Sequence, residues 1–383
     1  MLAALLYGQE DLRLEDVASP TAAVGEVVIK VQTATTCGTD LKVWRRGGHA
    51  RMLKPPTLFG HEGVGEIVSL GEGVTGWAIG DRVVANNSAP CMTCFFCQRR
   101  EYSLCPNLTF NNGTFAEYLK IPAPIVQHNL LPVPPELPNA LASLTEPLAC
   151  VLHGVASSNV QPGDRVVIIG DGAIGLMFVA VLAHQSAKKA GEVGGEERQG
   201  EKSSFGDIPG QGISFPAPSA LPLQSATEVF LFGGNEGRLQ IGQQLGASRT
   251  FNYHQLNDLP SVVRDLTKGW GADVVIEATG VPAVWESAIA CGRPGATINL
   301  FGGCPRDTTI TVSTEQLHYN ALTLKGVFHN TPVYVRDALA LLASRTIPFE
   351  LLISDHRTLK DLEQAFQDMK SRQAIKVAIE PGT

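Results

Sequence analysis

The chain has 383 residues, and chains of this length are normally too long for one hydrophobic core. Its length therefore predicts two domains. Hydrophobic residues make up 44% of it, charged residues 17% and aromatic residues 7%, which is the balance of an ordinary globular protein. The formal net charge of −7 disfavours a nucleic-acid partner, because such a partner is normally bound by a basic face.

Two apolar stretches need to be separated from targeting and membrane segments. The N-terminal run MLAALLYGQEDL lacks a basic region and a cleavage site, so we expect no signal peptide and a cytoplasmic protein. The stretch 166–183 is interrupted by Asp171 and three glycines, which favours a buried strand followed by a buried helix over a membrane span. In a reducing compartment, clustered cysteines are expected to bind metal rather than to form disulfides.

The first 150 residues are rich in valine, glycine and turn signals. Strands are predicted at 26–32, 62–70 and 81–86, separated by Gly, Asp and Pro. This pattern predicts a largely β domain.

From residue 151 onward, short apolar strands alternate with helices, which predicts a parallel sheet with crossover helices. The predicted strands are 166–170, 228–232, 273–277 and 296–301. The last stretch, 328–383, ends in the strand-like run AIKVAIEP, which we expect to return to the first domain.

The segment 186–225 interrupts this alternation. It is dense in Gly, Ser, Pro and mixed charge, whereas such connections normally take about 2–6 residues. We interpret it as a disordered insertion, with an oligomer or partner contact as the alternative.

The run VVIIGDGAIG places Gly170, Gly172 and Gly175 directly after a predicted strand and at the start of a predicted helix. The first glycine permits a tight turn, the second lets the backbone approach a pyrophosphate, and the third allows close packing of helix and strand. The helix N-terminus at Ala173 and Ile174 adds free N–H groups and a positive dipole end. The motif predicts a dinucleotide site, the alternative being a glycine turn that binds nothing.

Such sites normally carry an acidic residue at the end of the second strand, about 20 residues further on. Once 186–225 is set aside, this position falls on Gly233. The strand end therefore offers no carboxylate against a 2′-phosphate, and Asn235 and Arg238 follow it. We expect these two residues to contact the cofactor, and NADP to be tolerated or even preferred to NAD.

Four of the eight cysteines lie within CMTCFFCQRREYSLC, as Cys91, Cys94, Cys97 and Cys105. Four thiolates at this spacing can surround Zn²⁺ tetrahedrally from a single loop. Iron–sulfur clusters use related spacings, but nothing else in the sequence indicates electron transfer. Because four protein ligands leave no position for a substrate, this site is predicted to be structural.

A second group of potential ligands is dispersed along the chain. Cys37, His61, Glu62 and Glu146 could each be an ordinary buried or turn residue. Together they offer sulfur, nitrogen and oxygen, a mixture typical of an open, catalytic zinc site.

The runs GHEGVGEIVSLGEGVTGWAIGDRVV, GTFAEYLKIP, EPLACVLHG and GDGAIG, with the four-cysteine segment, resemble the zinc-dependent medium-chain alcohol dehydrogenases. The polyol (sorbitol-like) and threonine dehydrogenases are the most similar branch. The resemblance spans the chain apart from 186–225. It implies an α/β plus β fold: a GroES-like catalytic domain, 1–150 completed by 328–383, and a Rossmann NAD(P)-binding domain with a doubly wound parallel sheet, 151–327.

The resemblance also implies roles for individual residues. Cys37, His61 and Glu62 are expected to hold the catalytic zinc, with Glu146 binding it directly or through water. With the structural site, this makes about two zinc ions per chain. In this family the metal holds the substrate hydroxyl while hydride passes to the nicotinamide.

Further roles follow from the same resemblance. Thr39 matches the hydroxyl that starts a proton relay, and Asp40 is expected to orient His61. The nicotinamide pocket is expected to be lined by the segments 301–303 and 327–329, including Phe301, Gly302 and Val327.

Three features depart from the family pattern, and the first is Gly233 in place of the usual cofactor acid. Lys42 stands where many relatives carry a histidine of the proton relay. His329 and Asn330 stand where sorbitol dehydrogenases tend to carry Arg-Tyr, so metal and cofactor chemistry transfer more safely than the substrate.

The sequence thus predicts a zinc- and NAD(P)-dependent dehydrogenase of a secondary alcohol: a polyol, a sugar alcohol or a hydroxy-amino acid. Besides its small-molecule substrate we expect only further copies of the chain as partners, in a dimer or tetramer, and neither nucleic acid nor membrane. Two alternatives are a zinc-free quinone or enoyl reductase on the same scaffold and a non-enzymatic, nucleotide-binding redox sensor.

Overall fold

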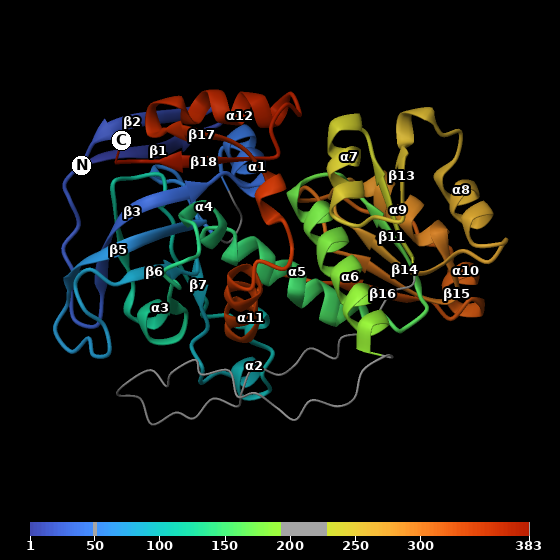
Figure 1. Ribbon diagram of the computed structural model, residues 1–383, viewed down its shortest axis with the longest axis horizontal. Helices are drawn as coiled ribbons and strands as arrows, with labels where there is room; N and C mark the ends of the chain where they lie inside the picture. The colour runs from blue at the N-terminus through green and yellow to red at the C-terminus, as the bar shows by residue number, and fades with distance from the viewer. Residues whose placement is uncertain (49–51, 193–227, 383) are drawn as a thin grey trace. The chain divides into compact units, whose positions relative to one another are not determined.

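The computed structural model describes residues 1–48, 52–192 and 228–382 (Figure 1). These residues form two compact units: 1–149 with 330–382, and 150–192 with 228–329. Residues 193–225 of the predicted insertion lie outside the described residues. Its first seven residues continue the helix α6 (Ala173–Glu192), so the helix extends further than the composition predicted.

The first unit is built on a mixed sheet. Among the described residues its strand order is β10-β6-β5-β3-β18-β17, with β9 also paired to β3. The strands are β3 (Val27–Thr35), β5 (Gly63–Leu70), β6 (Arg82–Ala85), β9 (Tyr118–Ile121), β10 (Leu130–Pro132), β17 (Ile353–Thr358) and β18 (Lys376–Glu380). β18 comes from the far end of the sequence and pairs antiparallel with β3, with Ala378 opposite Thr35.

Shorter elements surround this sheet. One small sheet has the order β2-β1-β4 and another pairs β7 with β8. Their strands are β1 (Leu2–Gly8), β2 (Asp11–Asp16), β4 (Thr57–Leu58), β7 (Ser88–Ala89) and β8 (Thr109–Phe110). The helices are α1 (Gly38–Arg46), α2 (Phe95–Gln98), α3 (Ala123–His128), α4 (Asn139–Ala142), α11 (Pro332–Ala343) and α12 (Leu362–Lys370), and α5 (Thr145–Ser158) begins in this unit.

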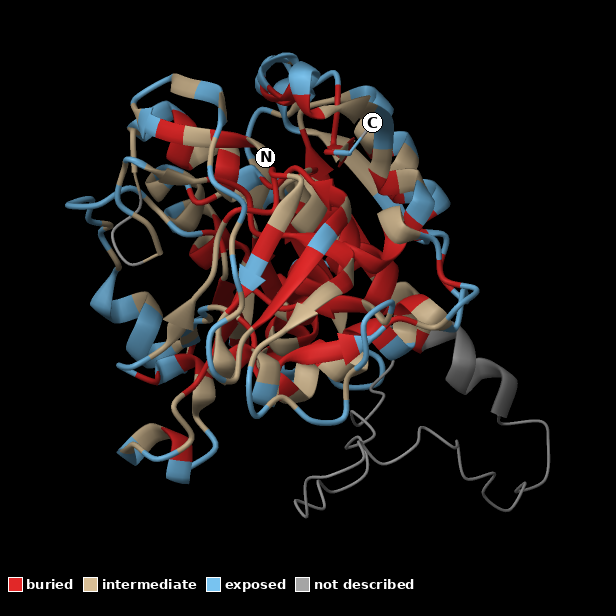
Figure 2. Ribbon diagram, turned by 90° about the vertical axis from the view of Figure 1, so that its left-hand side faces the viewer, coloured by how far each residue is buried: buried red, intermediate tan, exposed pale blue. Residues whose placement is uncertain are grey.

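Aromatic side chains form the centre of the first unit's core. Phe366 of α12 packs against Trp44, Phe59 and Phe115, with ring centroids 5.8–6.0 Å apart. All four side chains are fully buried, and buried residues follow the central strands of the sheet (Figure 2). The C-terminal helix is therefore part of this core.

The second unit has a parallel sheet of order β13-β12-β11-β14-β15-β16 in the described residues, which confirms the predicted doubly wound fold. Its strands are β11 (Arg165–Ile169), β12 (Glu228–Gly233), β13 (Arg249–Asn252), β14 (Ala272–Glu277), β15 (Gly292–Leu300) and β16 (Thr323–Gly326). Besides α6, the connecting helices are α7 (Glu236–Gln244), α8 (Leu259–Leu266), α9 (Pro282–Cys291) and α10 (Thr314–Tyr319).

The central strands of this sheet read as nearly continuous apolar runs because helices cover both of their faces. In β11 every residue after Arg165 is buried. All the strands run in one direction, so their carboxyl ends lie at one edge, where ligands bind in folds of this type. None of the described helices is long and apolar enough to cross a membrane.

Candidate functional site

The N-terminus of α1 fixes the first of the dispersed ligand candidates. Cys37 is the N-cap residue of this helix, and its Sγ accepts the N–H of Thr39 at 3.4 Å. In return, the Asp40 carboxylate accepts the N–H of Cys37 at 3.1 Å, which completes a capping box. The thiol is thereby held in one buried position.

Asp40 also orients His61, as the sequence predicted. Its Oδ1 lies 2.8 Å from His61 Nδ1, which leaves Nε2 as the ring nitrogen for another ligand. Burial disfavours the charged imidazolium, but the neighbouring Asp40 and Cys37 outweigh it and raise the pKa of His61 well above its usual value. The surroundings of this ring therefore favour a positive charge, carried either by a proton or by a bound metal ion.

Glu62 has one bonded and one unbonded carboxylate oxygen. Oε2 accepts hydrogen bonds from Lys376 Nζ at 2.6 Å and from Thr35 Oγ1 at 2.5 Å. Oε1 is buried and has no hydrogen-bond partner among the described residues. A buried carboxylate oxygen without a partner is costly, and a bound cation would relieve that cost.

The ligand atoms of Cys37, His61 and Glu62 all lie within 4.8 Å of one another. A thiolate, a neutral imidazole and a carboxylate are ligands that Zn²⁺ accepts, and three of them leave a coordination position open. The residues present therefore fit a catalytic zinc ion.

The other residues predicted for this site lie around it in different ways. Thr39 is half-buried beside Cys37, in the first turn of α1. Glu146 is not one of the three grouped ligands; its Oε1 instead accepts Asn330 Nδ2 at 3.1 Å. Asn330 also exchanges hydrogen bonds with Asn86 at 3.1 and 3.3 Å. This buried amide pair positions Glu146.

The four cysteines of the 91–105 segment converge on one point, around the short helix α2. Their sulfur atoms lie 3.5 Å apart between Cys94 and Cys97, 3.8 Å between Cys94 and Cys105, and 3.5 Å between Cys91 and Cys105. Four sulfurs bound tetrahedrally at about 2.3 Å from Zn²⁺ would be about 3.8 Å apart. None of them is in a disulfide, so the segment fits a closed zinc site.

The thiols of this segment differ in acidity. Hydrogen bonds from the backbone and hydroxyl of Thr93 lower the pKa of Cys91 to about 5. Burial, with hydrogen bonds from Cys94 and Cys105, raises the pKa of Cys97 to about 12. Metal binding must therefore release protons from the buried thiols.

The glycines of the fingerprint have the geometry that their predicted roles require. Gly170 has φ +124°, a conformation that disfavours a side chain. A Cβ at Gly175 would lie 1.8 Å from the carbonyl oxygen of Gly170, so helix and turn could not approach as they do. A Cβ at Gly172 would meet no atom within 4 Å, so this glycine faces open space where a phosphate can approach.

The other predicted cofactor residues follow the carboxyl ends of neighbouring parallel strands. Asn235 caps α7 after β12 and accepts the N–H of Arg238 at 3.1 Å. Phe301 and Gly302 follow β15, and Val327 follows β16. With Ala173 and Ile174 at the start of α6, these residues lie at the edge of the sheet that binds ligands in this fold.

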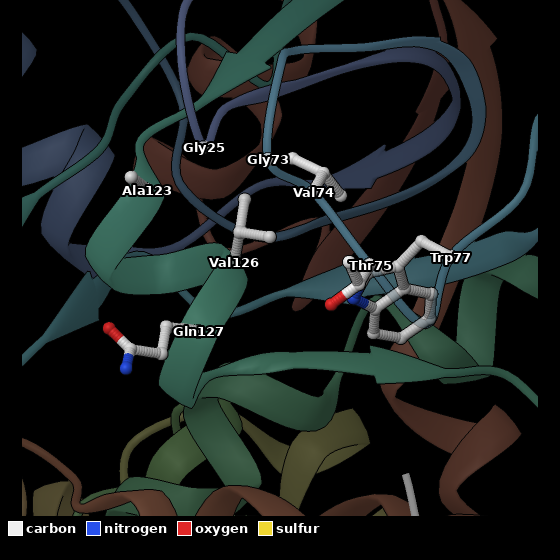
Figure 3. A pocket seen from close by; sticks show the side chains of 8 residues that line it. All are labelled: Gly25, Gly73, Val74, Thr75, Trp77, Ala123, Val126 and Gln127. Carbon is white, nitrogen blue, oxygen red and sulfur yellow. The ribbon is translucent and has the colours of Figure 1, made fainter. Parts of the chain in front are cut away.

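A separate hollow of about 250 Å³ lies in the first unit (Figure 3). No acid, base or thiol lines it, unlike the group formed by Cys37, His61 and Glu62. Its lining residues are Gly25, Gly73, Val74, Thr75, Trp77, Ala123, Val126 and Gln127.

The sequence reasoning missed three features of these sites. Lys376 contacts Glu62 from 314 residues away, and the pair Asn86–Asn330 spans 244 residues, so no local motif links them. Asp171, which the sequence analysis used only as an interruption of the apolar stretch 166–183, accepts the N–H of Gly234 just after β12. The sequence offered one indication of this contact. An acidic residue lies inside the glycine motif, while the acid usual at the end of the second strand is replaced by Gly233.

Two protein-family models match the chain. The alcohol dehydrogenase GroES-like domain matches 23–135, and the zinc-binding dehydrogenase domain matches 219–344. The chain is 29% identical to an L-threonine 3-dehydrogenase of Paraburkholderia phytofirmans over 374 residues, covering 96% of this chain and 95% of that protein. It is also 29% identical to a sorbitol dehydrogenase of Halalkalibacterium halodurans over 383 residues, covering 98% and 97%.

Solved structures show the same architecture. The alcohol dehydrogenase TADH from Thermus sp. ATN1 superposes with a TM-score of 0.79 at 25% identity, covering 99% of each chain. The 2R,3R-butanediol dehydrogenase of Bacillus subtilis gives a TM-score of 0.78 at 24% identity.

Proposed function

Because the chain belongs to the zinc-dependent medium-chain alcohol dehydrogenase family, we propose that it oxidises a secondary alcohol at Cys37, His61 and Glu62. The observation that carries this proposal is the buried Oε1 of Glu62, which has no hydrogen-bond partner in the described chain and lies beside a thiol and an imidazole. When bound, zinc supplies Lewis acidity toward an alcohol oxygen, and the nicotinamide supplies a hydride acceptor.

The protein's own residues prepare this site. Asp40 holds both the cap at Cys37 and the ring of His61, so one carboxylate sets the directions of two ligands. Lys376 and Thr35 bind Oε2 of Glu62, which leaves a single oxygen of that carboxylate free. Thr39, half-buried next to Cys37, is proposed to pass the substrate proton outward.

For the substrate we propose a polyol, a sugar alcohol or a hydroxy-amino acid, since the similar proteins include a sorbitol and a threonine dehydrogenase. The test is an absorbance screen for reduced nicotinamide with polyols, simple alcohols and threonine, using both NAD and NADP. Turnover of a secondary alcohol is expected. Reduction of quinones or enones without any alcohol oxidation would contradict the proposal.

The two candidate zinc sites are proposed to have different roles. The site at Cys37 is catalytic, and the site of the four cysteines in 91–105 is structural. Metal analysis of the purified chain should find about two zinc ions per chain. Cys37→Ser should lose turnover while keeping a folded protein and one zinc. A chain that retains full turnover as Cys37→Ser, or that contains no zinc as isolated, would contradict the proposal.

We propose that the enzyme works in the cytoplasm as a homo-oligomer, a dimer or tetramer. The described cysteines are all free thiols, which supports a reducing compartment. Light scattering coupled to gel filtration measures the assembly, and a monomer at micromolar concentration would contradict this part.

A further inference from the structure

Asp171, the second residue of the GDGAIG turn, has a buried carboxylate that bonds to the residues after the neighbouring strand. Asp171 is 7% exposed, and its Oδ2 accepts the N–H groups of Gly234 and Asn235, both at 2.8 Å. Its second oxygen, Oδ1, accepts no hydrogen bond from any described residue. A carboxylate from the loop after β11 is thus fixed at the carboxyl end of the neighbouring strand, β12.

This carboxylate occupies the space beside Gly233, the strand end that lacks the usual acid. A Cβ at Gly233 would lie 2.5 Å from the Cβ of Asp171 and 2.7 Å from its Oδ2. An acid at 233 and the present position of Asp171 therefore exclude each other. The negative charge is retained at this edge of the sheet, but it comes from a different strand.

We propose that Asp171 selects NAD over NADP in this chain, an inference that rests on the proposed dehydrogenase function. An adenosine ribose at the end of β12 can donate its 2′-hydroxyl to the carboxylate. A 2′-phosphate only accepts hydrogen bonds and is negatively charged, so it would be repelled by Asp171. The backbone N–H groups that could bind a phosphate there, at 234 and 235, are already bonded to Asp171.

Two other charged side chains, of opposite sign, follow this strand end in the first turn of α7. Arg238 is half-buried in the first turn of α7, and Glu236 is exposed in the same turn. The exposed Glu236 accepts Asn252 Nδ2 at 2.6 Å, so it too keeps a carboxylate near the end of β12. Gly233 and Arg238 taken alone predicted the use of NADP. Because the Asp171 carboxylate is hydrogen-bonded to the residues that follow β12, we expect NAD to be preferred instead.

The test compares the binding of NADH and NADPH to the zinc-loaded full-length chain by titration of protein fluorescence. The wild type should bind NADH at least about tenfold more tightly, because one charged hydrogen bond contributes about ten- to hundredfold. Asp171→Asn keeps the side-chain volume and one oxygen for the N–H groups but removes the charge. It should lower the NADH preference by about tenfold or more, and the variant should remain folded because one oxygen still accepts the N–H groups.

A second variant separates charge from turn geometry. Asp171→Gly with Gly233→Asp moves the carboxylate back to the strand end and should restore the preference for NADH. Equal binding of the two dinucleotides by the wild type, or an Asp171→Asn variant with an unchanged ratio, would overturn this inference alone. Failure to bind either dinucleotide would overturn the proposed function together with it.

Discussion

The buried ion pair between Lys376 and Glu62 allows a direct test of how the candidate zinc ligand Glu62 is held. Lys376 is 1% exposed and Glu62 is fully buried, and Lys376 Nζ also donates to the carbonyl oxygen of Thr36 at 2.8 Å. Lys376→Met fills a similar volume but leaves a buried carboxylate without its cation. Removing one partner of such a pair costs about 3–5 kcal/mol.

The expected change is large enough to measure by thermal unfolding. At about 2–4 °C per kcal/mol for a unit of this size, a loss of 3 kcal/mol lowers the melting temperature by about 6–12 °C. The loss should be smaller with zinc bound, since the metal compensates the charge of Glu62. Adding Glu62→Gln to Lys376→Met should recover much of the loss, because the unpaired charge is gone.

Lys370→Met is the matched control. Lys370 pairs with Glu10 at 3.2 Å, but both side chains are exposed, so the same substitution should cost less than about 1 kcal/mol. Equal losses of stability in Lys370→Met and Lys376→Met would refute the argument that burial makes the Lys376–Glu62 pair more important than the exposed pair.

Further outcomes can be measured in the same way. Gly175→Ala should prevent folding or strongly lower the melting temperature, since its Cβ would lie 1.8 Å from a carbonyl oxygen. Gly172→Ala should fold normally but bind NADH weakly in a fluorescence titration, because its Cβ enters open space at the turn. Phe366→Ala, in the fully buried aromatic core, should lose about 3–5 kcal/mol in urea unfolding. Cys94→Ser should lower the melting temperature and should reduce the zinc content by one ion per chain. Turnover should fall mainly because less of the protein is folded.

The sequence allowed the fold to be predicted because its signals are local. Apolar strands alternating with helices indicated the parallel sheet, and the glycines at 170, 172 and 175 marked its ligand edge. Cys37, His61 and Glu62 could be predicted as candidate ligands because a family pattern joins them, although the first two are 24 positions apart.

The contacts that support these ligands could not be found in the same way. Lys376 lies in a short apolar strand, where a lysine normally reads as an exposed residue, and only the pairing of β18 with β3 brings it to Glu62. Asn86 and Asn330 are unremarkable polar residues until the fold joins them. Partners of this kind depend on tertiary pairing and leave no periodic signal in the sequence.

The return of β18 to the first sheet has a consequence for the order in which the protein can be made. Synthesis proceeds from the N-terminus, and domains generally fold as they are completed. The strands of 1–149 are made early, yet their sheet and aromatic core lack Phe366 and β18 until residues 366–380 have been synthesised. The described strands of the parallel sheet lie between residues 165 and 326, so this sheet has all of them sooner. The unit that contains the earlier strands is therefore completed after the parallel sheet, and Glu62 stays without Lys376 throughout that interval.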